Sequence, residues 1–298
     1  MRSFYLILLH YFIFICPIRF NFANSLEIKY HIKKIAVATN FSDEAENAIN
    51  YAVLLAKKYR AGLDIIHAVS PTESRNKKAQ FVSAAYTRLK KYAKGITDEH
   101  GVEAKVFARV GEVRDFLYKY CVDHKTDLLI IGVRPHVKKY FTESKACEII
   151  MKIECPVLSI PPHFNNPHFS SVLLPVRDVE GVKEKLVYSR PFIKEDHSEL
   201  NILCFSQQST EKGMELVSVA KEQGMKARLL PFEISSKKNV SAEVIDAALE
   251  NEADLIVINA TSEKEWYKIF GENYTEYILK EADIAVLSIT HPFESAGV

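Results

Sequence analysis

The sequence has few cysteines and no excess of charge of either sign. Its 298 residues include five cysteines, which are far apart and form no Cys-x-x-Cys pair, so neither a disulfide framework nor a zinc site is supported. Lysine plus arginine (39) nearly equals aspartate plus glutamate (38), which argues against a basic nucleic-acid-binding protein and against an acidic disordered tail. These absences favour a protein of a reducing compartment, and we expect it in the cytoplasm.

The sequence motifs of several common enzyme classes are absent as well. The chain contains no Gly-x-Ser-x-Gly, His-Glu-x-x-His, P-loop or Gly-x-Gly-x-x-Gly pattern. His10, His136, His163 and His291 have no acidic or cysteine partner at metal-ligand spacing, so no metal is expected. Lysine doublets are dispersed among acidic residues without interleaved aromatics, which is typical of solvated helix faces rather than of a nucleic-acid surface. We therefore predict that the protein is not an enzyme.

The N-terminus carries an unusual apolar run. Phe4 to Cys16 is a stretch of 13 residues preceded by Arg2; it is shorter than the roughly 20 residues of a membrane span but fits the apolar region of a signal peptide. The other interpretation is an extension from a start codon set too early, although no other methionine occurs before Met151. Residues 1–30 are thus a leader, and export or membrane tethering through residues 4–16 is the alternative location.

From Lys33 onward, short apolar runs alternate with amphipathic stretches. A chain of this length is about twice the size of one domain, and strand and helix alternate five times before residue 162, which predicts a doubly wound parallel sheet. We place Ser42 or Asp43 at the first helix start and Gly62 at its end. Thr72 to Gln80 is predicted as a polar loop and a candidate partner surface. The expected strands are 35–38, 63–69, 104–108, 127–131 and 156–160, and the expected helices are 43–60, 78–100, 113–122 and 144–153.

A break in the pattern separates this unit from a second copy. Pro161 to Pro167 holds three prolines and two asparagines in seven residues, which indicates a linker. We therefore predict domain 1 at 31–162, a linker at 163–169 and domain 2 at 170–298. Pro191 interrupts the first helix expected in domain 2, which should be shorter or bent. Segments 172–176, 254–258 and 286–289 match 35–39, 127–131 and 157–160 at the near-constant offsets of 172 − 35 = 137, 254 − 127 = 127 and 286 − 157 = 129.

Four short motifs resemble the universal stress protein family: KKIAVATNFSDEA, a strand ending in HAVS, DLLIIG and CPVLSIP. The resemblance covers residues 33–162 well and 170–290 more loosely. It implies two tandem Rossmann-like domains, each a five-stranded parallel sheet of order 3-2-1-4-5 flanked by helices. Family domains commonly pair along strand five, which implies an intramolecular pseudo-dimer here, with a homodimer of such chains left open. Many members bind ATP, whereas others bind none and act through protein contacts.

The resemblance also indicates where a nucleotide would bind in domain 1. The family site lies at the carboxyl ends of strands one and four, the topological switch point. It uses an Asp after strand one, a Gly-x-x-Gly after strand four and a Gly-Ser or Gly-Thr at the next helix start. The residues that match or flank these positions and could still contact a nucleotide are Thr39, Asn40, Gly132, Arg134, Ser144 and Lys145.

Several substitutions weaken that site. Asn40 stands where the family has Asp, and Pro135 replaces the second glycine, which removes an N–H and fixes φ near −65°. Glu143 precedes Ser144, and its carboxylate at a helix N-terminus is favoured by about 0.3–1 kcal/mol while it repels phosphate. In domain 2, Arg177-Asp178 follows the first strand, and residues 259–262 contain no glycine. Domain 2 is therefore not expected to bind a nucleotide.

The sequence thus predicts a non-catalytic stress-response protein that acts through protein interaction or weak ligand sensing, independently of ATP and without a cofactor. The first alternative is an adenine-nucleotide (ATP or AMP) binding protein that uses domain 1. The second is a weak ATPase. The sequence does not identify a protein partner, and no nucleic acid partner is expected.

Overall fold

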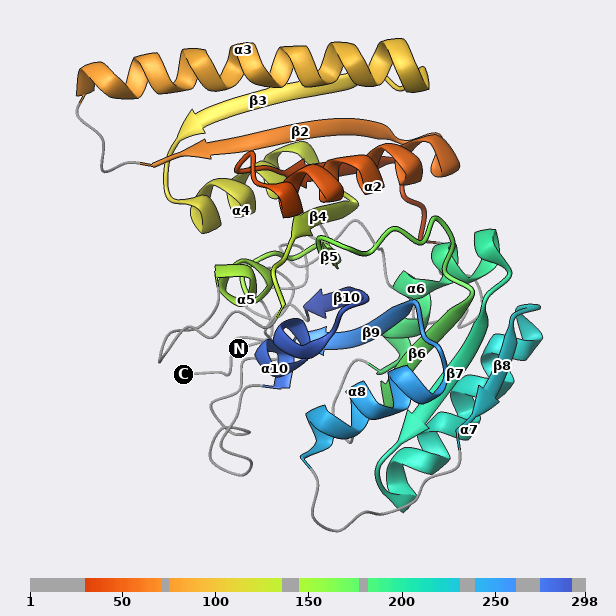
Figure 1. Cartoon of the computed structure of the whole chain (residues 1–298). Helices are drawn as coiled ribbons and strands as arrows, with labels where there is room; N and C mark the ends of the chain where they lie inside the picture. The colour runs from red at the N-terminus through yellow and green to blue at the C-terminus, as the bar shows by residue number, and fades with distance from the viewer. Residues whose placement is uncertain are drawn as a thin grey trace, which may run out of the picture.

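One ten-stranded sheet runs through both halves of the molecule in the computed structural model (Figure 1). The structure describes residues 30–70, 75–135, 145–176, 182–230, 239–260 and 274–290. Residues 1–29 of the leader, Glu143, Ser144 and the aromatic residues Trp266, Tyr267 and Phe270 lie outside the described residues.

The first half contains five strands and four helices among the described residues. Its strands are short and apolar, and β1, β4 and β5 are buried over most of their length, as parallel strands covered on both faces should be. The elements are β1 (Lys34–Ala38), α2 (Asp43–Tyr59), β2 (Gly62–Val69), α3 (Arg75–His100), β3 (Ala104–Val110), α4 (Val113–His124), β4 (Leu128–Gly132), α5 (Lys145–Ile150) and β5 (Val157–Ile160).

The second half repeats the alternation. Its central strand β9 is buried at every position. The elements are β6 (Ser171–Val176), α6 (Val182–Asp196), β7 (Glu199–Cys204), α7 (Gln207–Glu222), β8 (Lys226–Leu229), α8 (Val240–Glu250), β9 (Leu255–Ala260), α10 (Tyr274–Glu281) and β10 (Ala285–Thr290).

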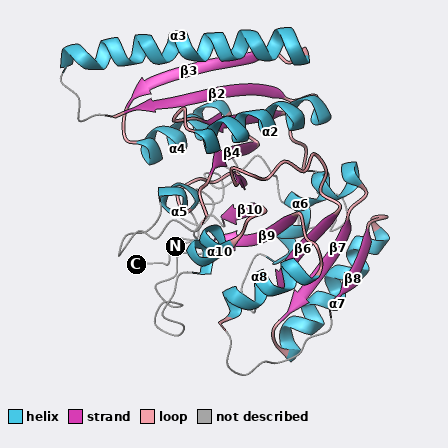
Figure 2. Cartoon of the chain, in the orientation of Figure 1, coloured by secondary structure: helices cyan, strands magenta, loops and turns pink. Residues whose placement is uncertain are grey.

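The strand order β3-β2-β1-β4-β5-β10-β9-β6-β7-β8 shows that each half has the order 3-2-1-4-5. Within each half the strands are parallel, whereas β10 and β5 are antiparallel, with Leu287 opposite Leu158. Two apolar cores lie on opposite faces of the sheet: α2, α3, α6 and α7 contribute to one, and α4, α5, α8 and α10 to the other. Figure 2 shows these helix layers around the strands. The doubly wound tandem fold is therefore confirmed.

Two local predictions were wrong, and a third was wrong only in the interruption expected at Pro191. Arg60, in the left-handed region with φ of 53°, ends α2 and its N–H bonds to the Ala56 carbonyl; Gly62 instead begins β2. Residues 75–80, expected in a polar loop, belong to α3. Pro191 lies inside α6, which continues to Asp196, although at 15 residues this helix is shorter than the 17-residue α2.

The segment between the halves is packed rather than solvated. Phe164 and Phe169 are buried, and both rings contact Tyr51 of α2 at centroid distances of 5.4 and 6.0 Å. Asn47 of α2 donates to the Pro161 and Phe164 carbonyls at 2.7 and 2.9 Å. Because apolar burial and buried hydrogen bonds both resist separation, this segment joins the halves as part of the core.

No helix in the described ranges has both the length and the apolar character required to cross a bilayer. The apolar run at residues 4–16 falls outside these ranges.

Candidate functional site at the carboxyl ends of β1 and β4

Four of the six predicted site residues come together at one edge of the sheet. Strands β1 and β4 are neighbours, with Ala38 opposite Ile131. Thr39 and Asn40 follow β1, while Gly132 ends β4 and Arg134 lies two residues further on. Lys145 begins α5 and is exposed, and Ser144 lies outside the described residues.

Thr39 and Asn40 form the turn from β1 into α2. Thr39 is buried, its N–H donates to the Ile66 carbonyl at 2.9 Å, and its hydroxyl oxygen accepts from the Phe41 N–H at 3.0 Å. Asn40 is exposed, and its Oδ1 accepts from the Ser42 N–H at 3.0 Å and from the Ser42 hydroxyl at 2.5 Å. A carbonyl oxygen has two lone pairs. The local turn therefore already uses both acceptor positions of Asn40 Oδ1.

Phe41 is a residue of this turn that sequence reasoning missed. Its φ of 64° is left-handed, a conformation that costs a non-glycine residue about 1–2 kcal/mol. The ring lies 4.6 Å from the His67 ring, and the Arg88 guanidinium carbon lies 4.3 Å from its centroid. His67 Nδ1 also contacts the Thr39 carbonyl at 2.7 Å. His67 is half-buried, and this contact gives its Nδ1 a partner in the turn.

Gly132 provides room for the start of α2. A Cβ built on Gly132 would lie 2.4 Å from the Glu44 carbonyl oxygen and 2.8 Å from the Ala45 backbone nitrogen. Protein interiors are close-packed, and backbone atoms cannot rotate away as a side-chain end can. The missing side chain therefore serves the packing of β4 against α2.

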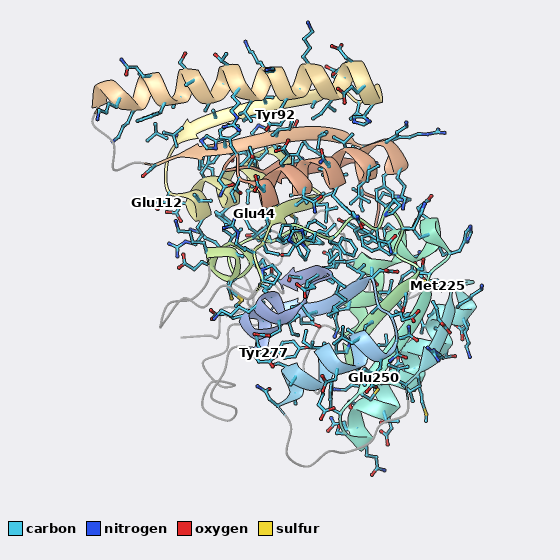
Figure 3. All side chains as sticks on the ribbon, viewed as in Figure 1. Glu44, Tyr92, Glu112, Met225, Glu250 and Tyr277 are labelled. Carbon is cyan, nitrogen blue, oxygen red and sulfur yellow. The ribbon has the colours of Figure 1, made fainter. Side chains whose placement is uncertain are left out.

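Arg134 and Glu44 form an ion pair across the same edge. The guanidinium donates to Glu44 Oε2 at 2.6 Å, with 57% of the Arg134 side chain and 15% of the Glu44 side chain exposed. Burial raises the pKa of Glu44, but hydrogen bonds from its own N–H, Arg134 and Ser42 outweigh burial and hold the pKa below its ordinary value. Glu44, labelled near the start of α2 in Figure 3, is therefore ionised at neutral pH.

The first turn of α2 carries two more acids, Asp43 and Glu46. Carboxylates at a helix N-terminus interact favourably with the exposed N–H groups and the helix dipole. They also place negative charge where a phosphate would have to approach. The sequence DEAE, which begins α2, carries the signal for this feature, although Glu44 itself was not predicted to contact Arg134.

The second half differs at the matching edge. Asn259 takes the place of Gly132 in the repeat (132 + 127 = 259) and is buried in β9. Lys185 of α6 is also buried, and its ammonium donates to the Pro175 carbonyl near the end of β6. Residues 177–181 and 261–273, which include Arg177-Asp178 and the residues between β9 and α10, lie outside the described residues.

The cysteines that the structure describes are shielded from solvent at least in part. Cys121, Cys147 and Cys204 are buried and Cys155 is half-buried. A hydrogen bond with Cys121 and burial both raise the pKa of the Cys155 thiol, which disfavours the nucleophilic thiolate. In the part of the chain that the structure describes, no cluster of three or more His, Cys, Asp or Glu residues could hold a metal ion.

Comparison with known proteins assigns the first half to a family. Residues 31–161 match the model of the universal stress protein family. Residues 31–161 form a universal stress protein domain. No curated protein matches the sequence of the whole chain.

Solved structures extend the likeness in fold to both halves. A universal stress protein from Archaeoglobus fulgidus has a TM-score of 0.73 and 16% identity, over 86% of this chain and 98% of its own. A putative universal stress protein from Pseudomonas aeruginosa has a TM-score of 0.54 and 13% identity, over 87% of this chain and 93% of its own. The universal stress protein domain is thus followed by a second domain of the same fold.

Proposed function

We propose that this universal stress protein-like chain is a non-catalytic stress-response protein, which acts through contacts with other proteins or weak ligand sensing and neither binds nor hydrolyses ATP. The family match of residues 31–161 supports the universal stress protein-like role. The proposal that ATP is not bound depends on one observation: intramolecular contacts already occupy the polar groups at the carboxyl ends of β1 and β4. Ser42 occupies Asn40 Oδ1, and Glu44 pairs with Arg134.

Electrostatics support the same proposal. A triphosphate at this edge would approach the ionised Glu44 and compete with it for Arg134. The acids in the first turn of α2 add to the repulsion. Glu44 is only partly exposed, and such a charge is screened less by salt than an exposed one, so its repulsion of a phosphate persists at physiological ionic strength.

Adenine-nucleotide binding in the first domain remains the second candidate, because Thr39, Asn40, Gly132 and Arg134 meet at one edge. An exposed ion pair contributes only about 0–1 kcal/mol. Arg134 could therefore leave Glu44 for a phosphate at small cost. A weak ATPase is the third candidate and requires the same binding step.

Thermal unfolding with and without millimolar Mg-ATP separates these candidates. A ligand at 100 times its Kd stabilises by about 2.7 kcal/mol, which raises Tm by several degrees in a chain of this size. We expect no shift for the wild-type chain. A shift that Ser144→Ala abolishes would contradict the proposal and favour the nucleotide-binding candidate, and release of inorganic phosphate would then test for an ATPase.

Two variants test the electrostatic explanation. Glu44→Gln removes the charged partner of Arg134, and Glu143→Gly removes the acid that precedes Ser144. We expect either change to permit a measurable ATP-dependent shift in Tm. Glu46→Gln is the matched control, because it removes a charge from the same helical turn without releasing Arg134, so its effect should be smaller than that of Glu44→Gln. Equal behaviour of Glu44→Gln and Glu46→Gln would show that the Glu44–Arg134 pair does not govern phosphate approach.

A further inference from the structure

The edge strand β3 has a row of backbone groups that no described strand pairs with. Among the described strands, β3 pairs only with β2, and it lies at the end of the sheet next to α3 (Figure 1). The Gly111 N–H donates to the Val69 carbonyl at 3.0 Å, and alternate residues of a parallel strand bond to the same neighbour. The outward positions, whose N–H and C=O groups face away from β2, are therefore Ala104, Val106, Ala108 and Val110.

Two cavities flank this edge. One, of about 580 Å³, runs along α3, where its lining includes Lys78 and Lys90, and reaches Val110. The other, of about 260 Å³, lies between β3 and α4. Tyr86 lines both cavities, so they lie on either side of this residue.

The cavity next to α4 has aromatic walls that neighbouring contacts hold in place. The Tyr120 and His124 rings stack at 4.0 Å, and Phe107 meets Tyr120 edge-on at 5.0 Å. The Tyr120 hydroxyl donates to buried Asp64 at 2.7 Å. A cavity that is already formed and has aromatic walls can hold an aromatic or aliphatic anchor.

Positive charge surrounds both cavities. Of the charged side chains that line them, Lys78, Lys90, Arg109 and Lys119 are cationic and only Asp123 is acidic. In a chain with nearly equal numbers of acids and bases, this local excess favours an anionic partner.

The opposite edge of the sheet provides a comparison. Arg228 on β8 contacts Glu199 at 3.2 Å, Asn201 at 2.7 Å and Asn251 at 3.3 Å. Within the described ranges, Arg109 on β3 has no ion pair or hydrogen bond through its side chain. Since β3 of a second copy would bring Lys105 and Arg109 against the same charges, a partner other than this chain is favoured.

We propose that β3 binds an acidic peptide segment of another protein as an additional, extended strand. Side chains of a strand alternate between its two faces. An added strand would therefore direct one set towards the lysines of α3 and the other into the aromatic cavity beside α4. The partner accordingly alternates acidic with aromatic or aliphatic residues, and its main chain bonds to the outward groups of β3.

Fluorescence anisotropy with synthetic peptides tests this proposal. The probe is a fluorescein-labelled peptide in which Glu and Phe alternate, and the comparison peptides alternate Lys with Phe and Glu with Ser. We expect the Glu–Phe peptide to bind the full-length chain saturably. Each comparison peptide should bind at least about tenfold more weakly, because it lacks one of the two chemical components.

Two proline variants test whether the peptide joins the sheet edge. Ala108→Pro removes an outward N–H that the fold does not use, and we expect the affinity for the Glu–Phe peptide to fall about tenfold. Ala227→Pro is the matched control: the Leu230 N–H donates to the Ile202 carbonyl, so Ala227 is an outward position on β8. This variant should bind like the wild type.

A double variant keeps the test decisive if Ala108→Pro unfolds the chain, as judged by circular dichroism. Lys78→Glu with Lys90→Glu reverses the charge of the α3 lysines that would face the acidic side chains of the peptide, leaves the backbone intact and should weaken binding of the Glu–Phe peptide by at least about tenfold. Equal affinity of this variant and the wild type would overturn the proposal.

Three other results would overturn it. These are the absence of saturable binding by the Glu–Phe peptide, tighter binding of a single-stranded oligothymidylate, and self-association of the chain that Ala108→Pro abolishes. The thermal shift with Mg-ATP reports on the carboxyl ends of β1 and β4 rather than on the free edge of β3, and it is measured separately. Failure of this proposal and failure of the proposed function are therefore distinguishable.

Discussion

The two halves agree at the amino ends of their strands and differ at the carboxyl ends. Asp127 precedes β4, and its Oδ2 accepts from the Lys33 and Lys34 N–H groups at 2.9 and 2.8 Å. Asp254 precedes β9 and accepts from the Ser170 and Ser171 N–H groups at 2.7 and 3.1 Å. In each half, a carboxylate therefore holds the start of the first strand beside the fourth.

The carboxyl ends do not share such a device. Gly132 in the first half lies against the α2 backbone, whereas the second half has buried Asn259 at that position and buried Lys185 on α6. The two halves thus share the carboxylate that holds the first strand beside the fourth, and they differ in the residues that a ligand would contact. A short motif such as Asp-Leu-Leu-Ile-Ile is consequently evidence for the fold rather than for a nucleotide site.

Removal of Asp127 or Asp254 tests the similarity between the amino ends of the strands and has the largest expected effect. Asp127→Ala leaves two backbone N–H groups without a charged acceptor, which should lower the free energy of unfolding by about 2–3 kcal/mol. Asp254→Ala should cost about 1 kcal/mol more, because its Oδ1 also accepts from Asn166 at 2.5 Å. Urea unfolding measures both values.

Asp98→Ala is the control for the aspartate variants, since Asp98 is exposed on α3. Its effect should stay within about 0.5 kcal/mol of zero. If Asp127→Ala behaved like Asp98→Ala, the shared carboxylate would not be a determinant of the fold.

Addition of a methyl group at a tight glycine probes the difference between the halves. Gly132→Ala forces a Cβ against α2 backbone atoms and should cost about 1–3 kcal/mol. Gly213→Ala in α7 meets Cys204 Sγ and Leu229 Cδ1 instead. Those side-chain ends can rotate, and alanine favours a helix by about 1 kcal/mol over glycine.

The midpoints of thermal unfolding of the two glycine variants should therefore separate clearly, with Gly132→Ala lower. Equal midpoints would mean that the start of α2 can move away from β4 as readily as a side chain rotates. The close approach that distinguishes the first half would then have no energetic consequence.

The smallest expected effect is a pH dependence of the contact between the halves. Burial raises the pKa of Asp196 in α6, but hydrogen bonds from Lys58 of α2, the Phe169 N–H and His168 outweigh burial and lower the pKa below its ordinary value. A lowered folded-state pKa stabilises the protein above the unfolded value of about 3.9. This stability is lost as pH falls through the folded-state pKa.

The difference in urea midpoint between the wild type and Asp196→Asn should therefore shrink as pH falls from about 5 to about 3. Asp98→Asn, at an exposed position, provides the reference for general acid effects. A difference that stays constant over this range would show that the Asp196 charge does not stabilise the contact with α2.

Much of the fold could be predicted from the sequence because its causes are local. Apolar runs such as Leu128–Ile131 have no polar alternation, and the repeat offsets reveal the second copy. Ends of elements were less predictable. Arg60 adopts a left-handed conformation without being glycine, and α6 continues through Pro191 because packing overrides helix propensity.

The site was predictable only in part. The position of Thr39, Asn40, Gly132 and Arg134 at one edge follows from the parallel topology. The Arg134–Glu44 pair joins residues 90 positions apart, and the contact between Gly132 and α2 depends on how closely two elements pack. Neither can be recognised from spacing along the chain.

The antiparallel pairing of β5 with β10 would hold the two halves together if the chain between them were cleaved. Hydrogen bonds and shared side-chain packing join β5 to β10. The same two kinds of contact join α2 to the segment after β5. Cleavage of the peptide between the halves would therefore leave a non-covalent heterodimer of two complementary fragments. The covalent connection fixes the two halves at a one-to-one ratio, and the contacts between β5 and β10 hold them together.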